Sequence, residues 1–298
     1  MTGVVSDKQY IEQLPDNYEW FEEQIAGHHP SVYKGGKREI GILKKQGSDK
    51  ILKVVQDGKR GICEVAFYRL IKGDKVCDCA DEETDPKRLW PNTSEEDCRL
   101  LAPFVPEYHG RQMLLVDGEE HEFLCFDDLT MGYKRPAILD IKMGRQTFDP
   151  NASTSKREKE SAKYPPQEKL GFRILGYRIH RQHEVAVRGK DWGRDYDENT
   201  VSDAMREFFY CGRENSQDAV HEAVVRQLEN ILFLFETQTS FHFYASSLFF
   251  IYETDADLPV NLTIKMIDFS HVFPGNGQLD ENYLPGVRTL LKLMADIA

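Results

Sequence analysis

An apolar stretch that carries an acid and a base two residues apart constrains this chain more than any other feature. Residues 136–144 read PAILDIKMG, with the breakers Pro136 and Gly144 at either end. In a β-strand, residues i and i+2 project from the same face, so Asp140 and Lys142 are expected to point the same way. Two charges on one face of an apolar strand predict either an internal ion pair or a functional site.

Two further apolar segments carry polar residues suited to nucleotide chemistry. Residues 265–271 read KMIDFSH, so Asp268 closes a predicted strand just before a turn. A carboxylate in that position is well placed to hold Mg²⁺ that bridges nucleotide phosphates. Residues 245–253 read ASSLFFIYE and predict a third strand, which begins near Ser246 and Ser247.

These motifs, P-x-x-x-D-x-K-x-G, then S-S-L, then I-D-F, resemble those of the inositol polyphosphate kinase family. The likeness extends from about Gln24 to the C-terminus, and residues 24–28, QIAGH, are similar to the opening motif of the multikinase branch. The resemblance implies an α+β, two-lobed kinase-like fold with a small N-lobe sheet and a larger C-lobe that contains the inositol phosphate site. It also implies ATP and Mg²⁺ as cofactors and soluble inositol tris- and tetrakisphosphates as substrates.

The resemblance assigns roles to the residues of these motifs. Asp140 would bind the ribose hydroxyls, and Lys142 would lie between the γ-phosphate and the attacking hydroxyl, where a positive charge stabilises the developing anion. Asp268 would hold Mg²⁺, supported by Ser246 or Ser247, of which we assign Ser247. Lys142 and Asp268 are therefore the expected catalytic residues.

A lysine and a glutamate near the N-terminus resemble a known phosphate-binding pair. Residues 39–44 and 51–55 predict a β-hairpin with Lys53 on its second strand, and Glu64 opens a helical pattern over residues 64–71. Protein kinases pair a strand lysine with a helix glutamate so that the lysine meets ATP phosphates. A strand lysine and a helix glutamate are more often surface residues, so the downstream motifs carry this assignment.

The chain is expected to divide into two lobes. Residues 1–126 would form the N-lobe, with an exposed acidic insertion near residues 73–99. Residues 127–298 would form the C-lobe, with an inositol-phosphate-binding segment near residues 145–190. No glycine-rich phosphate loop occurs in the sequence, so phosphate binding is expected to depend on Lys53, metal and backbone groups.

The junction of the two lobes is expected to bind adenine. A strand over residues 122–126 runs into residues 127–130, the position of the hinge in kinase-like folds. By resemblance, the carbonyl of Asp127 and the amide of Leu129 would face the adenine edge. From the residues alone, a strand-ending turn is the simpler interpretation.

A basic segment within an acidic chain predicts a local anion site. Residues 134–190 contain 14 Lys and Arg against 6 Asp and Glu, a net charge of +8, so the rest of the chain carries −20 of the total of −12. Lysines fall on one face of a predicted helix over residues 156–164, where they repel unless an anion or nearby acids offset them. By resemblance, the substrate-binding residues are Lys142, Lys156, Lys159, Lys163, Arg178 and His271.

Composition restricts the class of protein. A chain of 298 residues with 40% hydrophobic residues can bury a sizeable core. It contains no apolar run long enough to span a bilayer and no signal-peptide pattern, so we expect the cytoplasm or the nucleus. The net charge of −12 argues against nucleic acid as a partner, and a monomer is expected.

The cysteines predict neither disulfides nor a zinc site. Their spacing is irregular, and a chain of this size does not need disulfides, so all six are expected to be free thiols. Cys77 and Cys79 with Cys98 lack a fourth ligand, which makes zinc binding the less favoured interpretation.

The sequence is compatible with more than one inositol phosphate substrate and with a non-catalytic role. Multikinases tend to carry paired glutamines where this chain has Lys159 and Glu160, which leaves an inositol trisphosphate 3-kinase or a hexakisphosphate kinase as alternatives. A non-catalytic scaffold that retained the fold is the competing class. The presence of Lys53, Lys142 and Asp268 together favours the enzyme.

Overall fold

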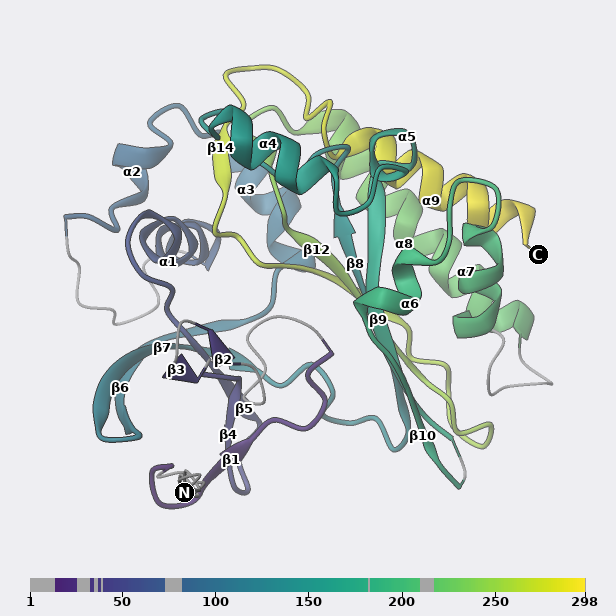
Figure 1. Ribbon diagram of the computed structural model, residues 1–298, viewed down its shortest axis with the longest axis horizontal. Coiled ribbons are helices and arrows are strands. Elements are labelled where there is room, and N and C mark those ends of the chain that lie inside the picture. The colour runs from purple at the N-terminus through teal and green to yellow at the C-terminus, as the bar shows by residue number, and fades with distance from the viewer. Residues whose placement is uncertain are drawn as a thin grey trace, which may run out of the picture.

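Two antiparallel five-stranded sheets organise the protein, and most of its helices pack around the second of them (Figure 1). This arrangement confirms the α+β class expected from the sequence. The computed structural model describes residues 14–25, 33–34, 37–38, 40–72, 82–181, 183–209 and 217–297.

The first sheet contains the expected N-terminal hairpin. Its strands in spatial order are β1 (Tyr18–Trp20), β4 (Leu43–Lys45), β5 (Lys50–Val54), β7 (Glu119–Asp127) and β6 (Tyr108–Val116). β4 and β5 pair antiparallel around a turn in which Gly47 has a φ of 72°, a conformation that favours glycine. A separate pair, β2 (Tyr33–Lys34) and β3 (Lys37–Arg38), lies outside this sheet.

The second sheet places the Asp140–Lys142 strand at its centre. Its strands in spatial order are β10 (Val185–Arg188), β9 (Phe172–His180), β8 (Pro136–Met143), β12 (Ser247–Glu253) and β13 (Thr263–Ile267). Every residue of β8 except Lys142 is buried, as its apolar sequence predicts for a central strand.

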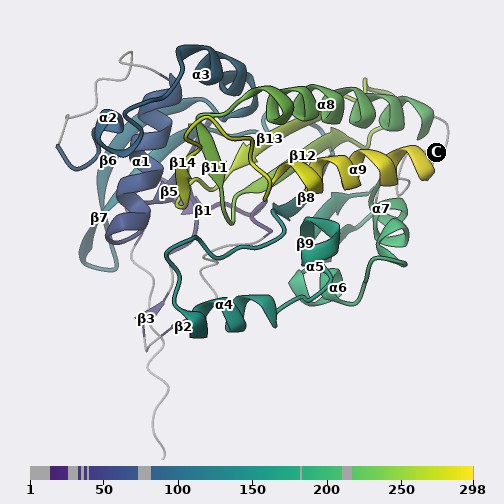
Figure 2. The same ribbon diagram turned by 90° about the horizontal axis from the view of Figure 1, so that it is seen from above.

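Helices cover both sides of the second sheet. The helices are α1 (Lys59–Lys72), α2 (Pro86–Leu89), α3 (Glu95–Leu101), the 3₁₀ turn Ala102–Phe104, α4 (Thr154–Ser161), α5 (Gln167–Leu170), α6 (Lys190–Arg194), α7 (Val201–Phe209), α8 (Gln217–Thr237) and α9 (Leu284–Asp296). Figure 2 shows α8 and α9 on one side of this sheet and α4 on the other.

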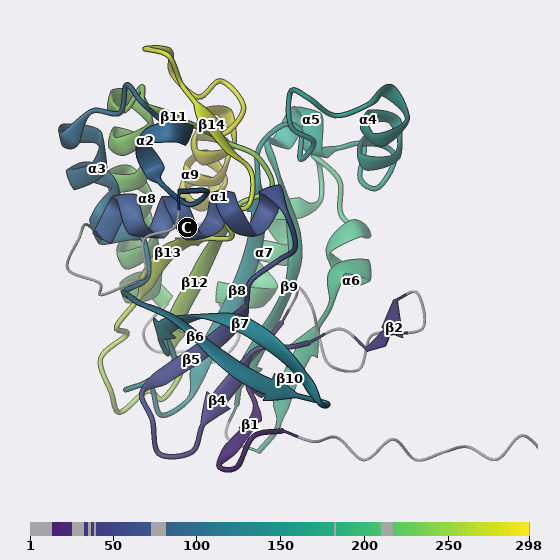
Figure 3. The same ribbon diagram turned by 90° about the vertical axis from the view of Figure 1, so that its left-hand side faces the viewer.

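Helix α1 connects the two sheets. It lies above the first sheet in Figure 3 and contacts β6 as well as β14 (Val272–Pro274), which pairs with β11 (Phe241–Phe243). Phe67 of α1 packs against Phe241, Phe243 and Phe269, with ring centroids 4.3–5.7 Å apart. These contacts hold α1 beside the turn that carries Asp268.

The predicted exposed insertion near residues 73–99 is described over residues 82–99, where most residues are exposed but some side chains are buried. Trp90 is only 3% exposed and packs edge-on against the Phe67 ring. Asp97 is 6% exposed and accepts hydrogen bonds from the backbone amides of Thr239 (3.1 Å) and Ser240 (3.0 Å). The ring of Trp90, directly after α2, and the carboxylate of Asp97 on α3 attach this segment to the rest of the structure. Cys77 and Cys79 lie outside the described residues.

The described cysteines, Cys63, Cys98 and Cys125, are free thiols, as expected. Cys211 lies outside the described residues. Within the described ranges, no helix combines the length and the apolar character that crossing a membrane requires.

Candidate active site

A cavity of about 340 Å³ lies between the first sheet and the strands β8, β12 and β13. Its lining residues include Lys53 and Asp268, which are more than 200 positions apart in the sequence. Its lining includes Ile42, Lys53, Asp127, Leu129, Asp140, Lys142, Asp268 and His271. The cavity therefore joins the predicted nucleotide residues with the predicted catalytic residues.

Lys53 joins the two sheets through two carboxylates. Its Nζ lies 2.6 Å from Oε1 of Glu64 on α1 and 2.5 Å from Oδ1 of Asp268 after β13. Burial lowers the pKa of Lys53, but the charges of Asp268 and Glu64 raise it more, so its net pKa lies above the ordinary value for lysine. Lys53 is thus a fixed cation at the edge of the cavity.

The turn after β13 is held in place by α1. Asp268 has a φ of 66°, in the left-handed region, which aspartate adopts at some cost. The amide of Phe269 donates to Glu64 Oε1 (3.4 Å), and the amide of Val272 lies 3.4 Å from the Cys63 sulfur. The surrounding contacts therefore impose this conformation and direct the Asp268 carboxylate toward Lys53.

Asp140 occupies a buried position close to Asp268. Burial and then the Asp268 charge raise its pKa, Lys142 opposes the shift, and the net pKa is about 6. Its Oδ1 is buried without a hydrogen-bond partner among the described residues, while the buried Ser247 hydroxyl lies close enough to lower the pKa of the Asp140 carboxyl. Buried polar atoms without partners are rare in proteins and indicate that a ligand or water completes their bonds.

Lys142 projects from the same face of β8 as Asp140. Its Nζ donates to the carbonyl oxygen of Ala245 (2.9 Å), a residue held in the left-handed region with a φ of 57°. Burial lowers the pKa of Lys142, while the charges of Asp268 and Asp140 raise it in part, and the net pKa is below the ordinary value. Lys142 therefore does not form a simple internal ion pair with Asp140.

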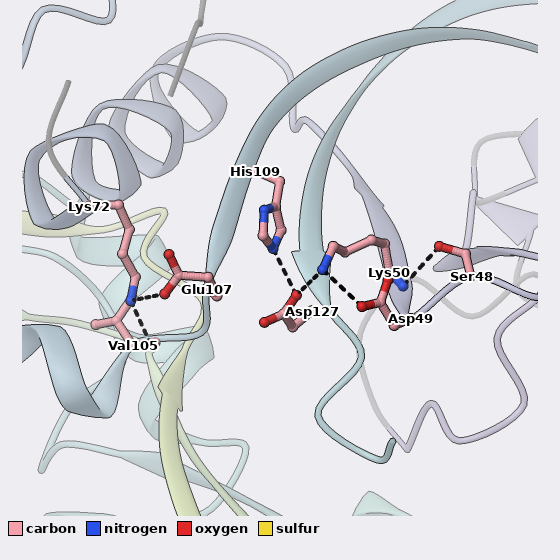
Figure 4. Close-up of polar contacts among 8 residues, drawn as sticks. All are labelled: Ser48, Asp49, Lys50, Lys72, Val105, Glu107, His109 and Asp127. Atoms are coloured by element: carbon pink, nitrogen blue, oxygen red, sulfur yellow. Dashed lines mark hydrogen bonds and ion pairs between the residues drawn. The ribbon is translucent and has the colours of Figure 1, made fainter. Parts of the chain in front are cut away.

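The segment after β7 is anchored by a charged cluster at the end of the first sheet (Figure 4). Asp127 accepts hydrogen bonds from Lys50 and from Nε2 of His109 (2.7 Å). Burial raises the pKa of Asp127, but these two partners lower it more, so the net pKa is below its ordinary value. Next to it, Asp128 binds Lys44. These contacts fix the residues that line the cavity at the predicted adenine position.

A second anchor lies beside this cluster in Figure 4. Lys72, at the end of α1, donates to Glu107 (3.0 Å) and to the carbonyl of Val105 (3.3 Å). Glu107 in turn accepts a backbone hydrogen bond from the amide of Asp127 (3.2 Å). The end of α1 is thus connected to the candidate hinge.

The lysines predicted to bind substrate lie on an exposed helix. Lys156 and Lys159 belong to α4, whereas Lys163 follows its end and pairs with Glu160 (2.6 Å). The helix is shorter than the predicted range of 156–164 because two prolines follow at positions 165 and 166. None of these three lysines lines the cavity of about 340 Å³.

His271 connects this helix to the cavity. Its Nδ1 lies 3.3 Å from Oδ2 of Asp149, and the same oxygen lies 3.6 Å from Nζ of Lys156. Burial lowers the pKa of His271, Asp149 raises it in part, and Lys156 lowers it. At neutral pH the imidazole is therefore mostly uncharged and can accept or donate a hydrogen bond in the cavity.

Comparison with known proteins identifies the family. Residues 123–295, more than half of the chain, match the family model described as inositol polyphosphate kinase. The chain belongs to the inositol polyphosphate kinase family. The match covers β8, β12 and the Asp268 turn, the elements that bring Asp140, Lys142 and Asp268 together.

Relatives of this inositol polyphosphate kinase family member include multikinases from animals and plants. It is 30% identical over 260 residues to human inositol polyphosphate multikinase, which covers 87% of this chain and 56% of the human protein. It is 28% identical over 299 residues to the multikinase IPK2 of Oryza sativa subsp. indica, with 93% of each covered. The chain thus spans just over half the length of the human relative.

A solved structure shares the fold of this family member. The crystal structure of the inositol phosphate multikinase Ipk2 from S. cerevisiae, in complex with ADP and Mn²⁺, aligns with a TM-score of 0.65 at 23% identity. The alignment covers 84% of this chain and 99% of the yeast chain. The likeness supports the α+β architecture described above.

The residues around the cavity fit a nucleotide with a divalent cation. Mg²⁺ is usually held by one or two carboxylates together with substrate phosphates. Asp268, whose side chain is 37% exposed, provides such a carboxylate, and the buried Ser247 hydroxyl lies on the strand paired with β8. In the part of the chain that is described, no cluster of three or more His, Cys, Asp or Glu forms a metal site made by protein alone.

Arg178 is not brought next to Lys142. It pairs with Ile138 on β8, four residues from Lys142, or roughly 13 Å along the strand. Its Nε lies 3.0 Å from Oε2 of Glu23, and Arg178 is not part of the cavity lining. The role of Arg178 in substrate binding therefore stays a prediction.

The sequence analysis did not single out Arg173, which lies directly opposite Lys142 in the register of β8 and β9. Simple alternation would place Arg173 and Arg178 on opposite faces of β9. The register shifts between Asp140 and Ile141, so both arginines lie on the face that carries Lys142. Gly176, an isolated glycine inside the strand that stands at the shift with a φ of 146°, is the signal in the sequence that could have indicated this bulge.

Proposed function

We propose that this protein is an ATP-dependent kinase that phosphorylates hydroxyls of soluble inositol polyphosphates, with the multikinase preference for tris- and tetrakisphosphates. Family membership supports this proposal, and so does the convergence of Lys53, Lys142 and Asp268 on one cavity. The proposal includes a two-lobed kinase-like arrangement, a monomeric state and a location in the cytoplasm or nucleus.

In this proposal the nucleotide binds between the two sheets. Backbone groups of Asp127 and Leu129 contact adenine, Asp140 binds the ribose hydroxyls, and Lys53, positioned by Glu64, contacts the phosphates. Asp268 holds Mg²⁺ with support from Ser247. Bound Mg²⁺ neutralises negative charge on the phosphate oxygens.

Lys142 is the residue to which we assign the main catalytic effect. Its ammonium group lies on the cavity side of β8, held by the Ala245 carbonyl rather than by a carboxylate partner. A positive charge that is fixed in a mostly dry site stabilises negative charge that develops during phosphoryl transfer. This half-buried ammonium, held by a carbonyl at the cavity, is the observation that carries the proposal.

The inositol phosphate binds on the α4 side of Lys142. Lys156, Lys159 and Lys163 provide positive charge, Arg178 adds to it, and His271 contacts the substrate. Charge-assisted hydrogen bonds to phosphate are among the strong polar contacts in proteins, so an exposed basic helix is suited to a highly charged ligand.

Product analysis tests this function. The purified protein is incubated with ATP, Mg²⁺ and a panel of inositol tris-, tetrakis- and hexakisphosphates, and the products are separated by chromatography. We expect added phosphates on tris- and tetrakisphosphates. The Asp268→Asn variant, purified in parallel, controls for contaminating kinases.

The alternatives give different outcomes. A single product made only from a trisphosphate would identify a 3-kinase, and conversion of the hexakisphosphate alone would identify a hexakisphosphate kinase. Binding of the panel without any turnover would contradict the proposal in favour of a scaffold.

A further inference from the structure

Arg173 is a half-buried cation, and two of its three guanidinium nitrogens have no partner among the described residues. Its Nε and Nη1 atoms are buried and have no hydrogen-bond partner among the described residues. Burying guanidinium donors without partners costs free energy, because they lose their bonds to water. Such an arrangement is stable only when a ligand or water completes the missing bonds, and the chemistry of the donors indicates an anion.

The position of Arg173 indicates where that anion binds. Arg173 and Lys142 are directly opposite each other on neighbouring antiparallel strands, where Cβ atoms lie about 4.5 to 5.5 Å apart. Both side chains therefore leave the sheet on the same face. A group that approaches the Lys142 ammonium from the side of β9 comes within reach of the guanidinium.

A carboxylate that interacts with Arg173, that of Glu160, already has another partner. Burial lowers the pKa of Arg173, and Glu160 on α4 raises it in part, so these two side chains interact. Glu160 nevertheless binds Lys163 (2.6 Å), and no ion pair joins Arg173 to a carboxylate in the described part of the chain. The guanidinium is thus attracted toward α4 without being neutralised there.

Arg173 itself lines neither cavity, but the two residues that relate to it line one each. Lys142 lines the nucleotide cavity, whereas Glu160 lines a second cavity of about 500 Å³ together with Arg145 and Gln146. The second cavity lies among α4, α5 and the loop before α9. A ligand that spans from Lys142 toward α4 therefore passes Arg173.

We propose that Arg173 is a substrate-binding residue that contacts a phosphate group on the inositol ring close to the hydroxyl that Lys142 faces. This inference rests on the proposed function and adds to it a specificity element: substrates with a phosphate near the reacting position are preferred. The planar fork of a guanidinium can bind such a phosphate with two parallel hydrogen bonds, which a lysine cannot do.

The competing role for Arg173 is purely electrostatic within the protein. In that case it only offsets the charge of Glu160, which would otherwise repel phosphates from α4. The two roles separate in a double variant, because Glu160→Gln removes the charge that needs to be offset but cannot replace a direct phosphate contact.

The experiment measures equilibrium binding, so that it does not depend on turnover. Inositol 1,4,5-trisphosphate and inositol hexakisphosphate are titrated calorimetrically in the presence of Mg²⁺ and a non-hydrolysable ATP analogue. The variants are Arg173→Leu, Arg173→Lys and Glu160→Gln/Arg173→Leu. Arg99→Leu, which removes an arginine that is exposed on α3, is the matched control.

We expect Arg173→Leu to weaken binding of at least one inositol phosphate about tenfold to a hundredfold, while binding of the ATP analogue is nearly unchanged. Arg173→Lys should recover part of the loss. The double variant should remain as weak as Arg173→Leu, and Arg99→Leu should match the wild type.

Recovery of binding in the double variant would overturn the inference, because Arg173 would then only offset Glu160. Equal loss of nucleotide and inositol phosphate binding, with a lower melting temperature, would also overturn it in favour of a structural role. A wild type that binds but does not phosphorylate these ligands contradicts the proposed kinase function, whereas the variant affinities still decide the role of Arg173.

Discussion

Two residues at the candidate active site hold backbone conformations that their side chains disfavour. Asp268 and Ala245 both lie in the left-handed region, at a cost of roughly 1 to 2 kcal/mol each. Asp268 contacts Lys53, and the Ala245 carbonyl accepts a hydrogen bond from Lys142. The positions of both lysines thus depend on strained turns that the surrounding structure maintains.

At the residue scale, Asp268→Asn should reduce turnover by roughly a hundredfold or more at saturating Mg²⁺. An amide is a much weaker ligand for Mg²⁺ than a carboxylate. Melting temperature should change little, because Lys53 keeps its ion pair with the buried Glu64. Steady-state kinetics and thermal unfolding on the same preparation check both parts. Normal turnover would remove Asp268 from the site.

Asp140 predicts a specific dependence of stability on pH. Its pKa is raised to about 6 in the folded protein, mainly by burial, against an ordinary value of 3.8. The folded state therefore binds a proton more tightly than the unfolded state, and the free energy of unfolding should fall as pH rises between these two values. The decrease attributable to Asp140 is at most roughly 3 kcal/mol.

Asp140→Asn should remove this part of the pH dependence and make the ligand-free protein more stable than the wild type at neutral pH. Urea unfolding of both proteins across this pH range measures the difference. Parallel stability curves for the two proteins would show that Asp140 titrates normally, contrary to the account.

Helices and strands could be predicted from the sequence where neighbouring residues alone determine them. The apolar sequence of β8 predicted its span, and the separation of Lys53 and Glu64 matched a strand followed by a helix. Helix α1, however, begins at Lys59 rather than at Glu64. Periodicity could not locate that start, because the first turn of α1 carries no strong hydrophobic pattern.

Other elements depended on contacts that the sequence does not display. The bulge in β9 arises from pairing with β8, so the neighbour of Lys142 could not be predicted from alternation alone. The acidic composition near residues 82–99 suggested exposure, yet Asp97 is buried because distant backbone amides bind it. The composition of a segment does not indicate which distant groups in the fold its side chains bind.

The buried carboxylate of Asp97 leads to a prediction for α3. Asp97→Ala should lower the free energy of unfolding by roughly 2 to 4 kcal/mol, because it leaves the amides of Thr239 and Ser240 without their acceptor. Glu96→Ala, which removes an exposed carboxylate from the same helix, is the control and should cost at most about 0.5 kcal/mol. Denaturant unfolding measures both, and equal effects would mean that α3 is not integrated into the fold.

At the scale of the whole molecule, charge is separated along the chain. Residues 134–190 carry +8 in a protein of −12. This segment supplies β8, β9 and β10 of the second sheet as well as α4, which Figure 2 shows on the side opposite α8 and α9. The separation favours anion binding at one region while the acidic remainder disfavours nonspecific polyanions.

Lys142 has the main catalytic role in the proposed function. It belongs to the basic segment and lines the cavity between the two sheets. Substituting methionine keeps the apolar stem and removes the charge that lies among Asp140, Asp268 and the proposed phosphates. If the charge acts mainly during phosphoryl transfer, the loss should appear in kcat and not in nucleotide affinity.

The most direct test measures kcat, the Kd for ATP and the melting temperature on Lys142→Met. We predict that kcat falls by about a hundredfold to a thousandfold, with the Kd for ATP and the melting temperature nearly unchanged. A destabilised variant that retains near-normal kcat at temperatures where it is folded would contradict the account, because Lys142 would then serve only to offset the buried Asp140 charge.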